Sequence, residues 1–104
     1  MSAIGTSILT AIVLRSNSRR LSLRIRCIAI LQVLPSSQAG TSWIVTLRRV
    51  PADTAGVLAQ CHPQEKFTLL AVDDLGHGVR GCVHVASVQM PRGVMELRGR
   101  GRLG

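Results

Sequence analysis

Residues 66–90 carry the pattern that most restricts the fold of this 104-residue chain. Two runs rich in β-forming residues, 66–72 and 79–90, flank residues 73–78, where two aspartates and two glycines accept turn conformations. The second run alternates with a period of two, as a strand with one buried face does. One face would carry Val79, Gly81, Val83 and Val85, and the other Arg80, Cys82, His84 and Ala86. The pattern predicts a β-hairpin over 66–90.

Shorter signals surround this hairpin. Residues 43–47 favour a strand, Asp53 can cap a short helix through Gln60, and residues 93–98 can add a strand after a Pro-Arg-Gly turn. Because a chain of this length is the size of one domain, we predict an α+β fold, a small β-rich single domain with its core in residues 43–98. The Arg-Gly sequence of residues 99–104 predicts a disordered tail.

Residues 1–42 contain arginines but no acidic residue. Their first apolar stretch, 4–14, predicts a helix with Ser2 as its N-cap. The second stretch, 21–34, begins with the alternation of a strand and then becomes continuously apolar, so a strand and a helix both remain open there. Linker residues follow at 35–42. We therefore predict a basic N-terminal segment, helical or strand-like, that acts as a targeting or surface-binding arm.

The composition of this segment, rich in Arg and Ser and poor in acids, is typical of organelle transit segments. Cys27, Cys61 and Cys82 are an odd number without a close pair, which argues against a disulfide framework and for a reducing compartment. We therefore predict an intracellular location, mitochondrial or in another organelle. Neither apolar stretch reaches the roughly 18–20 uncharged residues that a membrane-spanning helix needs, so no transmembrane span is predicted.

The formal net charge of +8 favours an anionic partner, which by charge alone is RNA or an acidic membrane surface. Nearly all the basic residues are Arg, whose planar guanidinium binds phosphate in a bidentate way, although codon bias explains the same excess. The anion-binding residues that we predict come from the N-terminal segment and from the tail. They are Arg15, Arg19, Arg20, Arg24, Arg26, Arg98, Arg100 and Arg102.

Side chains that could carry catalysis are few and poorly spaced. The soft and imidazole metal ligands of the C-terminal half are Cys61, His62, His77, Cys82 and His84. Their spacing does not match the paired ligands of structural zinc sites. A thiol nucleophile would need Cys82 with His84, or Cys61 with His62, and neither pair lies in a recognisable motif. The acidic pair at 73–74 occupies turn positions. We predict no catalytic, cofactor-binding or metal-binding residue, no cofactor and no enzymatic activity.

The aromatic residues that usually anchor a core are nearly absent, since the chain has one Trp, one Phe and no Tyr. Any core must therefore be aliphatic. The leading functional prediction is a small non-enzymatic basic protein that is targeted to an organelle or associated with an anionic surface. The first alternative is an RNA-associated binding protein. The second is a reading frame that was never selected for a folded product, which the skewed composition would also explain.

Overall fold

The computed structural model describes residues 5–18, 20–36, 40–61, 65–89, 92–101 and 103. Seven strands and one helix are found in these residues. In chain order they are β1 (Gly5–Ser16), β2 (Ser22–Ile25), β3 (Ile28–Ser36), β4 (Gly40–Arg48), α1 (Ala52–Ala59), β5 (Phe67–Asp73), β6 (Gly78–Gln89) and β7 (Val94–Arg100). The described chain is therefore dominated by β-structure.

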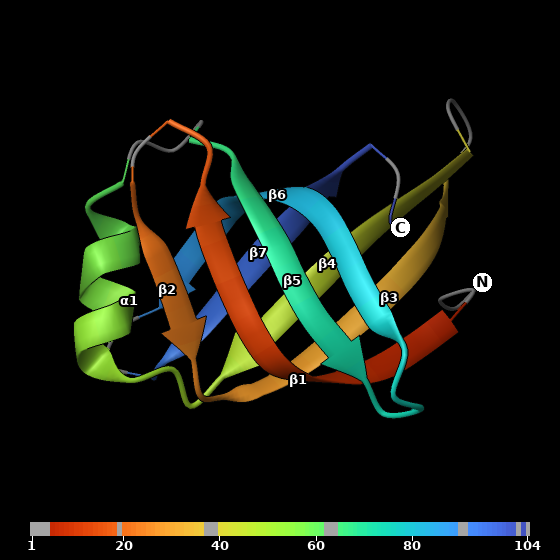
Figure 1. Ribbon diagram of the computed structural model, residues 1–104, viewed down its shortest axis with the longest axis horizontal. Coiled ribbons are helices and arrows are strands. Elements are labelled where there is room, and N and C mark those ends of the chain that lie inside the picture. Colours follow the sequence, from red (N-terminus) through yellow and green to blue (C-terminus); the bar gives the residue numbers. More distant parts are fainter. Residues whose placement is uncertain are drawn as a thin grey trace.

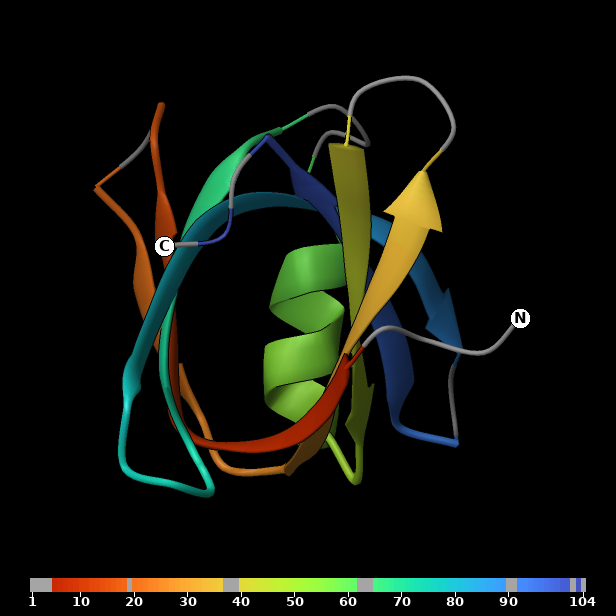
Figure 2. The ribbon, with the colours of Figure 1, turned by 90° about the vertical axis from the view of Figure 1, so that its right-hand side faces the viewer.

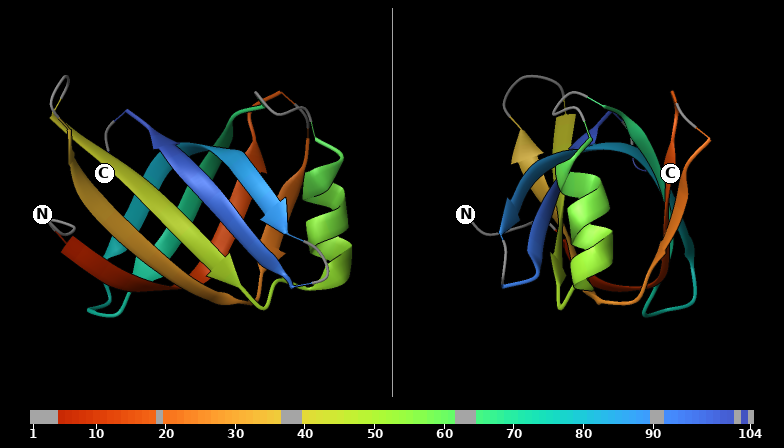
Figure 3. Two further views of the ribbon diagram at one scale, coloured as in Figure 1. Left: turned by 180° about the vertical axis from the view of Figure 1, so that it is seen from behind. Right: turned by 90° about the vertical axis from the view of Figure 1, so that its left-hand side faces the viewer.

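The strands form a closed antiparallel barrel. Six of them are hydrogen-bonded in the order β1-β3-β4-β7-β6-β5, and β5 pairs with β1 to complete the ring. β2 continues the line of β3 and pairs with the second half of β1 (Figure 1). Seen from behind, β3, β4, β7 and β6 lie side by side (Figure 3). α1 lies across one end of the barrel, where it is visible through the ring of strands in Figure 2.

The predicted α+β fold with a helical N-terminal segment is wrong, because residues 5–16 form strand β1. Leu9 is buried in the first half of β1, and the register with β5 then shifts between Thr10 and Val13. Ala11 lies in this bulge with a φ of 51°. Beyond it the buried residues of β1 are Ile12, Leu14 and Ser16. A bulge moves the inward side chains from odd to even positions, which breaks the alternation and makes the stretch resemble a helix.

The choice that the sequence left open for residues 21–34 is decided in favour of strands, β2 and β3. The continuous apolar run at 28–31 arises because outward side chains of β3 are apolar as well: Ile28 is 46% exposed. The predicted hairpin is confirmed, with β5 and β6 paired from Phe67 opposite Val83 to Val72 opposite Gly78. The strands predicted at 43–47 and 93–98 are confirmed as parts of β4 and β7.

α1 confirms the short helix predicted between Asp53 and Gln60, but Asp53 is not its N-cap. Pro51 occupies that position without a side-chain cap hydrogen bond, and Oδ1 of Asp53 accepts a hydrogen bond from the Thr54 amide at 2.9 Å. Ala55 and Leu58 are the buried residues of the helix. Within the described residues, no helix is long and apolar enough to cross a membrane.

The buried hydrophobic side chains are aliphatic apart from Trp43, Phe67 and Met95, in keeping with the composition. Two polar residues are buried as well, and the Ser16 hydroxyl donates a hydrogen bond to Oε2 of Glu65 at 2.7 Å. The Trp43 indole lies over the backbone of β6 and β7 at two glycines. A Cβ atom added to Gly81 would lie 2.6 Å from Cζ2 of Trp43, and one added to Gly99 would overlap the ring. Nε1 of Trp43 donates a hydrogen bond to the Gly101 carbonyl at 3.0 Å. The largest side chain of the core thus fits only because these two positions lack a Cβ atom.

Strands from the predicted N-terminal arm belong to the same core. The core residues from β1, β2 and β3 are Leu9, Ile12, Leu14, Ile25, Ala29 and Leu31. Of the predicted tail, Gly99 and Arg100 end strand β7, and Leu103 packs against the core. Residues 102 and 104 lie outside the described part of the chain. A targeting or surface-binding role for residues 1–42 stays a prediction.

Candidate anion-binding face

Outward side chains of β2, β1, β5, β6 and β7 form one surface that curves around part of the closed barrel and carries cations on β2, β1, β6 and β7. A row of paired positions crosses all five strands. From β2 to β7 it contains Ser22, Arg15, Thr68, Cys82 and Arg100. Arg15, Thr68 and Cys82 alternate with buried neighbours in their strands, and Ser22 and Arg100 are exposed, so the row lies on the outside of the barrel. The two arginines are three strands apart, which is about 14 Å along the surface at a strand spacing of about 4.8 Å.

Further cations flank this row on both sides. Arg24 on β2 pairs with Val13, and Arg80 on β6 pairs with Leu70. Each of these arginines is two residues away from the row in its own strand, and both lie on the same side of the row. On the other side, Arg98 is opposite His84, and Lys66 is exposed just before β5. We call this surface the basic face. Its cationic residues are Arg15, Arg24, Lys66, Arg80, Arg98 and Arg100, and all six are exposed. In Figure 1, β2, β1, β5 and the first half of β6 lie side by side at the front.

The acidic residues neutralise little of the positive charge of the basic face. All five carboxylates of the chain are among the described residues. Those on α1, before β5 and in the β5–β6 turn are Asp53, Glu65, Asp73 and Asp74. Among the described residues, the ion pair between a carboxylate and this face is that of Glu96 on β7, whose Oε1 lies 3.6 Å from Nη2 of Arg98. The basic face therefore carries a strong positive potential that is open to an anionic partner.

His84 is set among these cations. It lies directly opposite Arg98 on β7, and Arg100 is two residues further along the same strand. Burial lowers the pKa of His84 below its usual 6.5, and the positive charges of Arg100 and Arg98 lower it further. Nδ1 of the ring is buried and has no hydrogen-bond partner in the described structure. His84 is therefore a neutral group at pH 7 inside a positively charged surface.

The structure brings together half of the arginines predicted to bind anions. Arg15, Arg24, Arg98 and Arg100 share the basic face. Arg20 and Arg26 are exposed on either side of β2, in the connections to β1 and β3. The remaining two, at positions 19 and 102, lie outside the described residues. Membership of an anion-binding site stays a prediction for all eight.

The sequence prediction missed three members of this surface: Lys66, Arg80 and His84. A signal for Arg80 and His84 was present, because the alternation of residues 79–86 places both on the polar face of the hairpin. Their connection to the N-terminal arginines had no local signal. It depends on the pairing of β5 with β1, which joins two distant parts of the chain.

The candidate catalytic and metal groups do not assemble. Among the described residues, no three His, Cys, Asp or Glu side chains lie together in a way that could hold a metal ion. Cys82 and His84 share the outer face of β6, whereas His62 lies outside the described residues. Burial raises the pKa of the Cys27 thiol to about 11, so this thiol stays protonated and is a poor nucleophile. No catalytic arrangement is seen in the described part of the chain.

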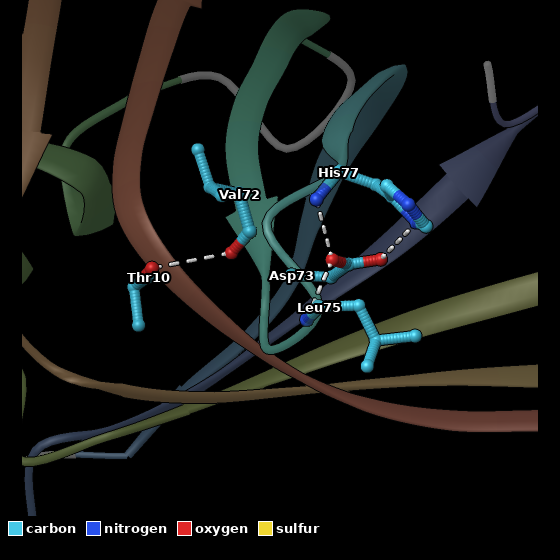
Figure 4. A network of polar contacts seen from close by, with 5 residues as sticks. All are labelled: Thr10, Val72, Asp73, Leu75 and His77. Carbon is cyan, nitrogen blue, oxygen red and sulfur yellow. Dashed lines mark hydrogen bonds and ion pairs between the residues drawn. The ribbon is translucent and has the colours of Figure 1, made fainter.

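Asp73 organises the β5–β6 turn, as its position in the sequence predicts (Figure 4). Its Oδ1 accepts hydrogen bonds from the backbone amides of Leu75 at 3.0 Å and His77 at 2.8 Å. Nδ1 of His77 lies 3.7 Å from Oδ2 of the same carboxylate. Beside the turn, the Thr10 hydroxyl donates to the Val72 carbonyl at 3.3 Å and ties β1 to β5. Asp73 is thus engaged in turn structure.

A groove of about 310 Å³ lies between α1 and the second half of β6. Its lining residues are Leu58, Ala59, Cys61, Val85, Ala86, Ser87 and Val88. Among the described lining residues, only a thiol and a hydroxyl supply polar side-chain atoms, and Sγ of Cys61 donates to the Val57 carbonyl at 3.4 Å. None of these described residues carries a charged or imidazole side chain.

The chain matches no protein-family model, and comparisons with curated proteins and with solved structures find no similar protein. The geometry of this chain alone therefore carries the functional assignment.

Proposed function

We propose that the protein is a non-enzymatic binding module that holds the phosphate backbone of a nucleic acid against its basic face. The observation that carries this proposal is the placement of five exposed arginines on β2, β1, β6 and β7 and of Lys66 just before β5, with the Glu96 carboxylate 3.6 Å from one of the arginines. Arginine side chains neutralise backbone phosphates and release their counterions, which supplies most of the affinity of sequence-independent binding.

An acidic membrane surface fits the same charge less well. Membrane binding by a basic surface is strengthened by apolar side chains that insert beside the cations. Of the large apolar side chains in the described residues, Leu75 is the most exposed, at 76%, but it lies beside Asp73 and Asp74 at the β5–β6 turn. Ile8 and Ile28, about half exposed, lie on the first half of β1 and on β3, outside the basic face. Binding to the phosphates of a nucleic acid does not require the insertion of apolar side chains.

Base recognition is expected to be weak. Proteins that bind single strands tightly usually stack bases on exposed aromatic rings. Both large aromatic residues of this chain are in the core, where Trp43 is 1% exposed and Phe67 is fully buried. Contacts to phosphates through Arg and Lys therefore dominate, and we expect little discrimination among sequences.

The test is a salt titration of binding to a fluorescently labelled single-stranded RNA of twenty nucleotides. Four to six phosphate contacts predict that log K falls against log salt concentration with a slope of about −3 to −4. Duplex DNA, heparin and vesicles with anionic lipids serve as competitors. No binding at low salt, a slope near zero, or tighter binding to the vesicles than to RNA would contradict the proposal.

Glu96 is expected to act as an internal competitor for the phosphate at Arg98. A solvent-exposed ion pair is worth at most about 1 kcal/mol, so a phosphate can displace it. Glu96→Gln is therefore expected to strengthen RNA binding by up to about fivefold, measured by the same titration. The control is Asp74→Asn, which changes the net charge equally in the exposed β5–β6 turn. Equal gains in the two variants would show that net charge, not Arg98, causes the effect.

A further inference from the structure

We propose that His84, Arg98 and Arg100 form a subsite for one phosphate of the bound nucleic acid, and that occupation of this subsite is coupled to uptake of a proton by His84. The inference rests on the proposed function and adds a regulatory property to it. Binding would strengthen as the pH falls through the range in which His84 titrates.

The first argument is the arrangement of the three side chains. Arg98 lies opposite His84, and Arg100 lies two residues along β7 on the same outer face, about 7 Å away at the rise of an extended strand. Cys82 fills the position opposite Arg100. Two guanidinium groups and an imidazole thus border one patch of the basic face. A phosphate accepts hydrogen bonds from each of these donors.

The second argument is the access to the imidazole ring. Nδ1 of His84 is buried without a partner among the described residues, so Nε2 is the ring nitrogen that a ligand at the surface would contact. A phosphate at Nε2 would accept its N–H and would place negative charge beside the ring.

The direction of the proton coupling follows from the groups that face His84. The two arginines of β7 oppose a positive charge on the ring. If the β5–β6 register continues by one residue beyond Phe67 and Val83, Lys66 is the cation on the β5 side of His84. The acidic neighbour on β7, Glu96, is engaged by Arg98. On the α1 side, the titratable group among the described residues that line the groove beside the second half of β6 is the Cys61 thiol. A bound phosphate is therefore the charge that would offset the arginines and favour the protonated ring.

The sign of the pH effect is then determined. If the pKa of His84 is higher in the complex than in the free protein, the complex binds more protons, and affinity rises as the pH falls. The gain is complete below the free-protein pKa, which lies under 6.5. Each unit by which binding raises the pKa contributes about tenfold in affinity.

The experiment compares RNA affinity at pH 7.5 and pH 5.5 with an oligouridylate, whose bases and phosphodiesters keep their charge over this range. We expect a gain of about five- to tenfold at the lower pH for the natural chain. His84→Gln, which keeps a hydrogen-bond donor but cannot titrate, is expected to lose this gain. His77→Gln, in the exposed β5–β6 turn, is the matched control and is expected to retain it.

Proton NMR of the imidazole signals provides the second measurement, with the His84→Gln spectrum used for assignment. The pKa of His84 is expected to be higher with oligouridylate than without it. If His84→Gln binds RNA and keeps the same pH gain, or if the pKa of His84 does not rise on binding, the subsite is refuted while nucleic-acid binding stands. If the natural chain does not bind RNA at either pH, the proposed function itself fails.

Discussion

A Gly99→Ala variant is expected to lose about 3 kcal/mol of unfolding free energy, at the upper end of typical overpacking effects. The new methyl group would overlap the Trp43 indole, which is fully enclosed and is held through Nε1 to the Gly101 carbonyl. The ring has no room to move toward β6, because it already fills the space beside Gly81, where an added Cβ atom would lie 2.6 Å from Cζ2 of Trp43. Since the indole is rigid and has no free space, the strain must spread to the β6–β7 backbone.

A urea titration followed by Trp43 fluorescence and far-UV circular dichroism measures this loss. Gly78→Ala is the matched control, because a Cβ atom at this position of β6 meets no atom within 4 Å. It is expected to change stability by less than about 1 kcal/mol. Equal midpoints for the two variants would contradict the packing of Trp43 on Gly99.

The same titration tests the alternative that the reading frame was never selected for a folded product. A closed barrel with one core predicts coincident, cooperative transitions by both probes in the natural chain. For a chain without a selected fold, we expect gradual and non-coincident changes. The Trp43 emission would then be typical of a solvent-exposed indole before urea is added.

Loss of three cations from the basic face is expected to weaken RNA binding by about a hundredfold. In the variant Arg15→Gln, Arg98→Gln, Arg100→Gln, each lost phosphate contact removes roughly fivefold in affinity at about 0.1 M salt. The slope of log K against log salt concentration is expected to become shallower by about 2. Both values come from one salt titration of the labelled RNA.

The matched control removes the same net charge elsewhere. Arg48, Arg49 and Arg92 are exposed at the end of β4 and before β7, outside the basic face, and are changed to Gln together. This control is expected to retain most of the affinity and of the salt slope. If both triple variants weaken binding equally, the protein attracts RNA by net charge alone, and the basic face has no special role.

The two predictions depend on the packing of Trp43 on Gly99 and on the basic face, and sequence patterns predict these features only in part. The alternation of residues 79–86 correctly separates the buried from the outward side of β6, because side-chain direction in a strand depends only on local geometry. The same rule fails in β1, where the bulge at Ala11 moves the buried positions from Leu9 to Ile12 and Leu14. No residue type marks this bulge, since glycine is the usual choice at a positive φ and the chain has alanine there.

The sequence by itself determined the net positive charge, the aliphatic character of the core and the β5–β6 hairpin, because these depend on composition and on neighbouring residues. Only the tertiary structure decided that Arg15 and Arg100 share one surface. Their strands are joined through β5 and β6, and the link between β5 and β1 closes the barrel. Such long-range pairing is selected by the burial of a whole core and by the removal of open sheet edges, which no local pattern encodes.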